Sequence, residues 1–205
     1  MKLYSDPFAP NPRRVLWLMA EKGVDDIQVV RTETMKAEHR APAYLAKAGL
    51  PLVPALELDD GTVISESIAI CRYLESLHPE PNLFGRDPLE TAVIEMWTRR
   101  AELLFATPLM LAVRNSLPAL ATLGPQSPER AASEGRIIET YLPLFERRLG
   151  DSPFLGADRL TMADIVAAAS VGFGRLIRFE FPGDCPNLRR WWDVMRERPG
   201  AKSGR

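Results

Sequence analysis

The first 78 residues contain short segments in which apolar and polar residues alternate. These segments are separated by longer ones in which apolar residues recur at helical spacing. Strands are expected where aliphatic side chains alternate or cluster, at residues 3–4, 27–31, 55–58 and 62–64. Helices are expected where apolar side chains recur three and four positions apart, at residues 12–22, 42–48 and 65–77. This β-α-β-α-β-β-α order predicts a mixed sheet with helices on both faces.

Several residues in this region are typical of helix ends and turns. Asn11 followed by Pro12 predicts the N-cap and first residue of the first helix, and Gly23 predicts its C-cap. Asp60-Gly61 predicts a tight hairpin turn between the last two strands. Ser65 predicts the N-cap of the third helix.

From residue 89 onward the pattern is helical throughout. Residues 79–88 hold three prolines and a glycine and form the best linker candidate. Long helices are expected at residues 89–115, with a kink at Pro108, and from Ser127 to Gly150. Residues 161–164 predict a capping box ahead of an all-round apolar, buried helix, and residues 187–198 predict a last helix stopped by Pro199-Gly200. We therefore expect a domain over residues 1–78, a linker over 79–88 and an all-helical domain over 89–205.

Composition and charge exclude several classes of function. The 205 residues are 46% hydrophobic, with 26 basic and 27 acidic side chains, so no excess of positive charge favours a nucleic-acid partner. No apolar run is long enough to span a membrane, and the first residues lack the apolar core of a signal peptide, so we expect a cytoplasmic protein. Two cysteines and two histidines, all apart, predict no structural metal site and no internal disulfide centre.

Four segments, in order along the chain, are similar to sequence motifs of the glutathione S-transferases. They are Val53-Pro54-Ala55-Leu56, the run Glu66-Ser67-Ile68-Ala69-Ile70, residues 154–164 and residues 186–191. Residues 9–15 and 20–23 resemble bacterial members of the cytosolic type. The resemblance implies a thioredoxin-like, glutathione-binding N-terminal domain and an all-α C-terminal domain that holds the second substrate and forms a homodimer. For the dimer, the long helix offers Val93, Met96 and Trp97.

The resemblance also implies which residues bind glutathione. Glu66 would pair with the α-ammonium group, and Ser67 would hold the α-carboxylate at a helix N-terminus, where the dipole favours anions. Val53 would bind the cysteinyl backbone as an added strand does, with Pro54 in the cis form. His39, with Lys36 or Arg40, would contact the glycine carboxylate. The alternatives are a plain helix cap at residues 65–67 and a solvated loop around His39.

The group that activates the glutathione thiol is the open question of the sequence. A thiol with a pKa near 8.5 is mostly protonated at pH 7, and each unit of lowering needs about 1.4 kcal/mol of thiolate stabilisation. The resemblance implies a Tyr, Ser or Cys near the first helix, or in some bacterial groups Thr and Asn in a Thr-Pro-Asn pattern. Pro10-Asn11 fits that pattern and puts Ala9, which has no hydroxyl, at the position of the Thr. Asn11 is our candidate, with Ser5 as an alternative; for Asn11 the competing interpretation is a plain N-cap.

The second substrate would lie between the domains, beside the first-helix loop and the long helix. Phe8, Ala9, Arg99 and Leu103, with Phe105, are the candidates for this electrophile pocket. The function implied is conjugation of the glutathione thiolate to a small hydrophobic electrophile, in detoxification. The alternatives are glutathione-dependent reduction of disulfides or peroxides, and a non-catalytic glutathione-binding protein. Glutathione is the expected co-substrate, with no metal, nucleic acid or membrane partner.

Overall fold

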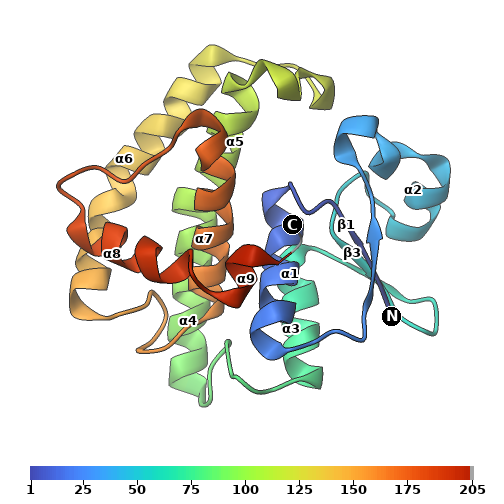
Figure 1. The fold of residues 1–205 in the computed structure, drawn as a ribbon, viewed down its shortest axis with the longest axis horizontal. Helices are drawn as coiled ribbons and strands as arrows, with labels where there is room; N and C mark the ends of the chain where they lie inside the picture. Colours follow the sequence, from blue (N-terminus) through green and yellow to red (C-terminus); the bar gives the residue numbers. More distant parts are fainter. Residues whose placement is uncertain (204–205) are drawn as a thin grey trace.

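The computed structural model describes residues 1–203 and has a sheet-containing part followed by a helical part (Figure 1). The first part contains β1 (Lys2–Ser5), α1 (Pro10–Lys22), β2 (Gln28–Arg31), the short turns η1 (Thr34–Lys36) and η2 (Glu38–Arg40), α2 (Pro42–Ala48), β3 (Ala55–Glu57), β4 (Val63–Ser65) and α3 (Ser67–Leu77). The second contains α4 (Pro88–Ala101), the π-helical turn η3 (Glu102–Ala106), α5 (Thr107–Ser116), η4 (Pro118–Leu123), α6 (Pro128–Asp151), α7 (Met162–Gly174), η5 (Arg175–Ile177), α8 (Pro186–Met195) and α9 (Pro199–Lys202). The predicted thioredoxin-like arrangement followed by helices is confirmed.

The sheet has the order β2-β1-β3-β4, with β1 and β2 parallel and the other neighbours antiparallel. Successive side chains of a strand point to opposite faces. Leu3 and Leu56 accordingly join the core formed with α1 and α3, while Tyr4 and Ala55 pack with Tyr44 of α2 on the other face. Figure 1 shows α2 on the outer side of the sheet and α1 and α3 between the sheet and the helical part.

The strand register brings four connections to one edge of the sheet. Ser5 pairs with Arg31, Tyr4 pairs with Ala55, and Ala55 pairs with Ser65. The segments that follow β1, β2 and β4, and the segment that precedes β3, therefore all leave from the same edge. We call this the loop edge; it comprises residues 6–11, 32–41, 52–54 and 66–67.

Two of the predicted helix starts are wrong. Helix α1 begins one residue before Asn11, and Ala9 is its N-cap, because prolines at positions 10 and 12 both fit a first turn that needs no backbone N–H. Helix α3 begins at Ser67 with Glu66 as its N-cap. Ser65 is instead the last residue of β4, and its hydroxyl donates to the carbonyl of Ala48. The predicted C-cap at Gly23 is confirmed, with φ of 65°.

The helical part is built around α7. This helix contacts α1, α4 and α5, and nearly all its side chains are buried, as its apolar sequence predicts. The predicted long helix at 89–115 is continuous, but the π-helical turn η3 widens it just before Pro108. A proline without an N–H cannot complete the α-helical bond to the turn before it, which explains the local change of pattern.

The C-terminal segment departs from the sequence prediction. Helix α8 ends at Met195 rather than near Arg198, and it is not the last helix, because Pro199-Gly200 begin the short helix α9. Helix α9 lies against α1 (Figure 1). Arg198 donates to the carboxylate of Glu21 at 2.7 Å, which ties this segment to α1.

Candidate functional site

The loop edge gathers every residue that the sequence assigns to glutathione. The N-terminus of α1 and the N-terminus of α3 also lie there, since α1 follows β1 and α3 follows β4. Both helices present the positive end of their dipole, which stabilises a carboxylate or a thiolate. Helix α3 adds the backbone N–H groups of its first turn, whereas in α1 Pro10 and Pro12 have none and Asn11 supplies the N–H of the first three positions. The edge is thus electrostatically suited to an anionic ligand.

Glu66 and Ser67 form the link from β4 to α3. Glu66 is exposed and has φ of 71°, a conformation that L residues rarely adopt and that clusters at ligand sites. Ser67 is only 4% exposed, and its Oγ accepts a hydrogen bond from Nη1 of Arg14 at 3.2 Å. The geometry is more specific than a simple cap, because no side-chain cap bond is made at this helix start among residues 1–203.

Val53 and Pro54 lie next to this link, on the neighbouring strand. The Val53–Pro54 peptide bond is cis, as the resemblance implies. Tyr44 of α2 donates its hydroxyl to the carbonyl of Leu52, which holds the connector in place. Within residues 1–203 the backbone of Val53 makes no hydrogen bond, so it can pair with an added peptide strand.

The loop after β2 is fastened to the loop after β1 by one carboxylate. Oδ2 of Asp6 accepts from the backbone and hydroxyl of Thr34, at 3.0 and 2.6 Å, and its Oδ1 accepts from the backbone of Phe8 at 3.1 Å. Asp6 could not be singled out from the sequence, because a lone aspartate beside a proline carries no distinguishing pattern.

His39 lies in this loop and is 6% exposed, so it is not the solvated side chain of the alternative interpretation. Its Nδ1 has no hydrogen-bond partner among the described residues. Burial, assisted by the charge of Arg40, lowers the pKa of His39 below its usual value. The neutral imidazole would therefore contact a carboxylate as a hydrogen-bond donor rather than as a cation.

The candidate thiol activators differ in accessibility. Asn11 is half-buried in the first turn of α1, and within residues 1–203 its side-chain amide has no hydrogen-bond partner. Because Asn11 does not cap the helix, the competing use of its side chain is removed. Ser5 is fully buried, and its hydroxyl has no partner among the residues that the structure describes; the burial argues against direct contact with a thiol.

The protein's own cysteines are buried and unpaired. Both Cys71 and Cys185 are free thiols, and burial raises the pKa of each. They remain protonated at neutral pH, so a reactive sulfur at the loop edge would come from a ligand.

The electrophile candidates fall into two groups. Phe8 and Leu103 are 70% and 53% exposed, which suits contact with an apolar substrate. Phe105 is wrong as a candidate, because it is buried and stacks on Phe181 in the aromatic core. Arg99 donates to Glu102, which in turn binds Arg14. Arg14 and Glu102 could not be singled out from the sequence, since neither one stands out from the many charged helix residues.

A bridge between the two parts bounds the site on the side of η4. Arg40 donates to the carbonyl of Leu123 at 2.9 Å, and Arg114 donates to the same carbonyl at 2.8 Å. Thr122 lies 3.9 Å from the sulfur of Met35. The contacts of Arg40 and Met35 with η4 could not be anticipated from the sequence, because each joins residues more than 80 positions apart.

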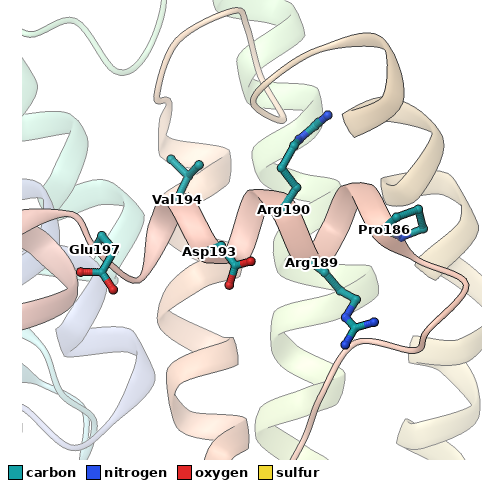
Figure 2. A pocket seen from close by; sticks show the side chains of 6 residues that line it. All are labelled: Pro186, Arg189, Arg190, Asp193, Val194 and Glu197. Carbon is teal, nitrogen blue, oxygen red and sulfur yellow. The ribbon is translucent and has the colours of Figure 1, made fainter.

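A separate hollow of about 770 Å³ follows the exposed face of α8 (Figure 2). It is lined by Pro186, Arg189, Arg190, Asp193, Val194 and Glu197. None of these residues belongs to the loop edge.

Over residues 1–203 no group of three or more His, Cys, Asp or Glu side chains is arranged to hold a metal ion. No helix in the same range combines the length and apolar character needed to cross a membrane.

Comparisons with known proteins agree with this geometry. Residues 8–77 match the family model of the glutathione S-transferase N-terminal domain, and residues 109–199 match that of the C-terminal domain. Glutathione S-transferase 2 of Saccharomyces cerevisiae is 36% identical over 98% of this chain and 88% of its own. The chain belongs to the glutathione S-transferase family.

Other members of the family support the assignment over the whole length. Glutathione S-transferase F13 of Arabidopsis thaliana is 30% identical over 97% of this chain and 92% of its own. The crystal structure of Gtt2 from Saccharomyces cerevisiae has a TM-score of 0.91 at 35% identity, covering 98% of this chain and 99% of that one. A glutathione S-transferase domain-containing protein of Marinobacter aquaeolei has a TM-score of 0.92 at 33% identity, covering 98% and 99%. This transferase thus resembles yeast and plant members in sequence as well as bacterial ones.

Proposed function

We propose that this glutathione S-transferase conjugates glutathione to a small hydrophobic electrophile. The thiolate sulfur attacks an electrophilic carbon, a carbon–sulfur bond forms, and the bond to a leaving group such as halide breaks. The thiol proton passes to solvent, and no other reactant is consumed. The observation that carries the proposal is the convergence of Val53-Pro54, Glu66-Ser67 and the start of α1 at the loop edge.

In this proposal residues 1–78 bind glutathione through His39, Val53, Pro54, Glu66 and Ser67. Residues 79–88 connect them to residues 89–205, which supply the second substrate's surface. Phe8, Ala9 and Leu103 would contact the electrophile, with Arg99 beside them. The exposed Phe8 and Leu103 support an apolar second substrate.

The proposal assigns thiolate stabilisation to Asn11. Its amide has no hydrogen-bond partner in the described part of the chain, and it lies in the first turn of a thirteen-residue helix whose dipole also favours a thiolate. We expect Asn11→Ala to raise the pKa of the bound glutathione thiol by about one unit, which corresponds to about 1.4 kcal/mol. Thiolate absorbance followed against pH measures this directly, and an unchanged pKa and turnover would rule Asn11 out.

A non-catalytic glutathione-binding role is the second candidate, favoured by Ala9, whose side chain cannot donate a hydrogen bond to the thiolate. Disulfide or peroxide reduction is the alternative chemistry. Retention on a glutathione column tests binding, and parallel assays with an aryl halide and a small disulfide separate conjugation from reduction. Binding without either activity would support the second candidate.

The proposal includes a homodimer and a cytoplasmic, detoxifying role. Met96 and Leu89 of α4 are exposed apolar side chains that a second copy could cover, whereas Trp97, also expected at this surface, is buried against Phe145. Two free cysteines fit a reducing compartment. Light scattering at micromolar concentration should give the mass of two chains; the mass of one chain would contradict the dimer.

A further inference from the structure

Residues 50–53 form most of the connector from α2 to β3, and little of the protein holds them. The side chains of Leu50 and Leu52 are exposed, so they add little packing. Among residues 1–203 a single hydrogen bond reaches this stretch, from the hydroxyl of Tyr44 to the carbonyl of Leu52. The orientation of the connector backbone therefore depends on one side chain of α2.

Tyr44 is itself held firmly against the sheet. It is buried with Ala48 and Ala55, and its ring meets the ring of Tyr4 edge-on, with the centroids 5.9 Å apart. Ala48, the last residue of α2, accepts a hydrogen bond from the hydroxyl of Ser65 at 3.2 Å. Burial raises the pKa of Tyr44 to about 12, so its hydroxyl keeps its proton and can donate at neutral pH.

Val53 is the residue of the connector whose backbone would pair with glutathione. Its N–H and its carbonyl have no hydrogen-bond partner in the described part of the chain, and its side chain packs against the cluster around Tyr44. An added strand gains affinity from main-chain hydrogen bonds, which weaken steeply when the groups turn out of line. The direction of the Val53 N–H is therefore important for affinity.

The carbonyl of Leu52 and the N–H of Val53 belong to the same peptide unit, which is planar. This peptide bond is trans, so its carbonyl and its N–H point in opposite directions. When the Tyr44 hydroxyl binds the carbonyl from the side of α2, the N–H is directed away from α2. A carbonyl that accepts a hydrogen bond also polarises its peptide unit, which makes the N–H a better donor.

We infer that Tyr44 is a positioning residue for glutathione, which acts through the carbonyl of Leu52 to direct the Val53 N–H at the cysteinyl carbonyl of the ligand. The inference rests on the proposed glutathione site and adds to it a residue of α2 that does not touch the ligand. Glutathione affinity then depends on one hydroxyl on the far side of the connector.

Removal of this hydroxyl tests the role. Glutathione dissociation constants are measured by titration calorimetry for the unaltered enzyme and for Tyr44→Phe, which keeps the buried ring. We expect Tyr44→Phe to weaken glutathione binding about fivefold, the effect of one ordinary hydrogen bond. An affinity that stays within about twofold of the unaltered value would overturn the inference.

A modified ligand separates positioning from general support of the fold. The analogue in which a trans carbon–carbon double bond replaces the cysteinyl–glycine peptide bond keeps the extended shape and has no carbonyl to accept from Val53. Tyr44→Phe should change the affinity for this analogue by less than about twofold, because the bond is absent in both enzymes. A loss of about fivefold for the analogue as well would show that Tyr44 only supports the fold.

Hydrogen exchange of the Val53 amide gives a readout that needs no variant, should Tyr44→Phe not fold. Followed by NMR in the unaltered enzyme, the exchange of this amide should slow by about tenfold when glutathione is bound and should not slow with the analogue. Equal protection by the two ligands would refute the bond through which Tyr44 acts.

Tyr4→Phe is the matched control. It removes a tyrosine hydroxyl from the same face of the sheet, where Tyr4 donates to Glu57 at 2.5 Å and not to the connector. Glutathione affinity should stay unchanged; a loss comparable to that of Tyr44→Phe would refute the specific role of Tyr44. If the unaltered enzyme does not bind glutathione, the proposed function falls and the inference with it. If it binds and Tyr44→Phe weakens glutathione and the analogue equally, only the inference falls.

Discussion

The buried carboxylate of Asp164 accepts four hydrogen bonds from three segments of the chain. Its Oδ1 accepts from the backbone of Leu155 and from the indole of Trp191, at 2.8 and 2.9 Å. Its Oδ2 accepts from the backbone and hydroxyl of Thr161, at 3.0 and 2.7 Å. Burial raises the pKa of Asp164, and these four donors oppose that shift. The carboxylate thus joins the start of α7 to the preceding loop and to α8.

Removing this carboxylate should be strongly destabilising. We expect Asp164→Ala to lower the free energy of unfolding by about 3–5 kcal/mol, because four donors lose their acceptor inside the core. Denaturant titration measures the change. The exposed Asp151→Asn serves as the control and should change stability by less than about 0.5 kcal/mol. Equal effects from the two substitutions would contradict the role of Asp164.

His39 should make stability depend on pH near neutrality. Its folded pKa lies below the usual value of 6.5, so the unfolded chain binds a proton first as pH falls. The free energy of unfolding should therefore decrease as pH drops below about 6.5, and His39→Gln should flatten this slope. Urea unfolding between pH 7.5 and 5.5 measures both curves; identical slopes would disprove the assignment.

At the level of elements, the C-terminal helix α9 depends on one glycine. A Cβ built on Gly200 would lie 1.9 to 2.3 Å from atoms of the Trp17 indole on α1. Trp17 is itself fully buried and donates to Glu21. Only a residue without a side chain allows α9 to pack this closely. The close approach explains why a Pro-Gly pair, normally a stop signal, begins a helix here.

Two glycine substitutions should therefore have opposite effects. Gly200→Ala should destabilise the protein by about 1–3 kcal/mol, because the added methyl overpacks a rigid indole. Gly172→Ala, in α7, meets no atom within 4 Å and should stabilise it by about 0.5–1 kcal/mol. Thermal and denaturant unfolding compare the variants. A neutral Gly200→Ala would show that α9 can move away from α1.

At the level of the whole molecule, the sheet-containing and helical parts share one core. Buried side chains of the first part, including Leu3 and Trp17, belong to the same hydrophobic cluster as those of α7. The buried Arg14–Glu102 pair crosses the same boundary. Neither part can therefore lose its structure without exposing apolar surface of the other.

This shared core should make the two parts unfold together. Trp17 reports on the first part, and substituting the other three tryptophans with phenylalanine isolates its signal. We expect its fluorescence transition in urea to coincide with the loss of helical circular dichroism, because a two-state protein gives one midpoint by every probe. Separate midpoints would show that the parts are independent.

Much of this architecture is encoded locally and could be predicted from the sequence. The positions of most strands and helices and the buried character of α7 follow from hydrophobic period and proline placement, which act within a few residues. Helix starts were less reliable: at Asn11 and Ser65 a good capping side chain was present, but neighbouring prolines and strand pairing determined where the helix began. Local preference is a weak constraint when tertiary contacts compete with it.

The sequence by itself determined the family, the order of elements and the residues expected to bind glutathione, because these depend on local pattern and on motifs. The tertiary structure alone decided which residues lie together. It placed Arg14 of α1 between Ser67 and Glu102, joined Arg40 to Leu123, and packed Gly200 on Trp17. The physical reason is that such contacts depend on burial and close approach between distant segments, for which the spacing of residues along the chain carries no signal.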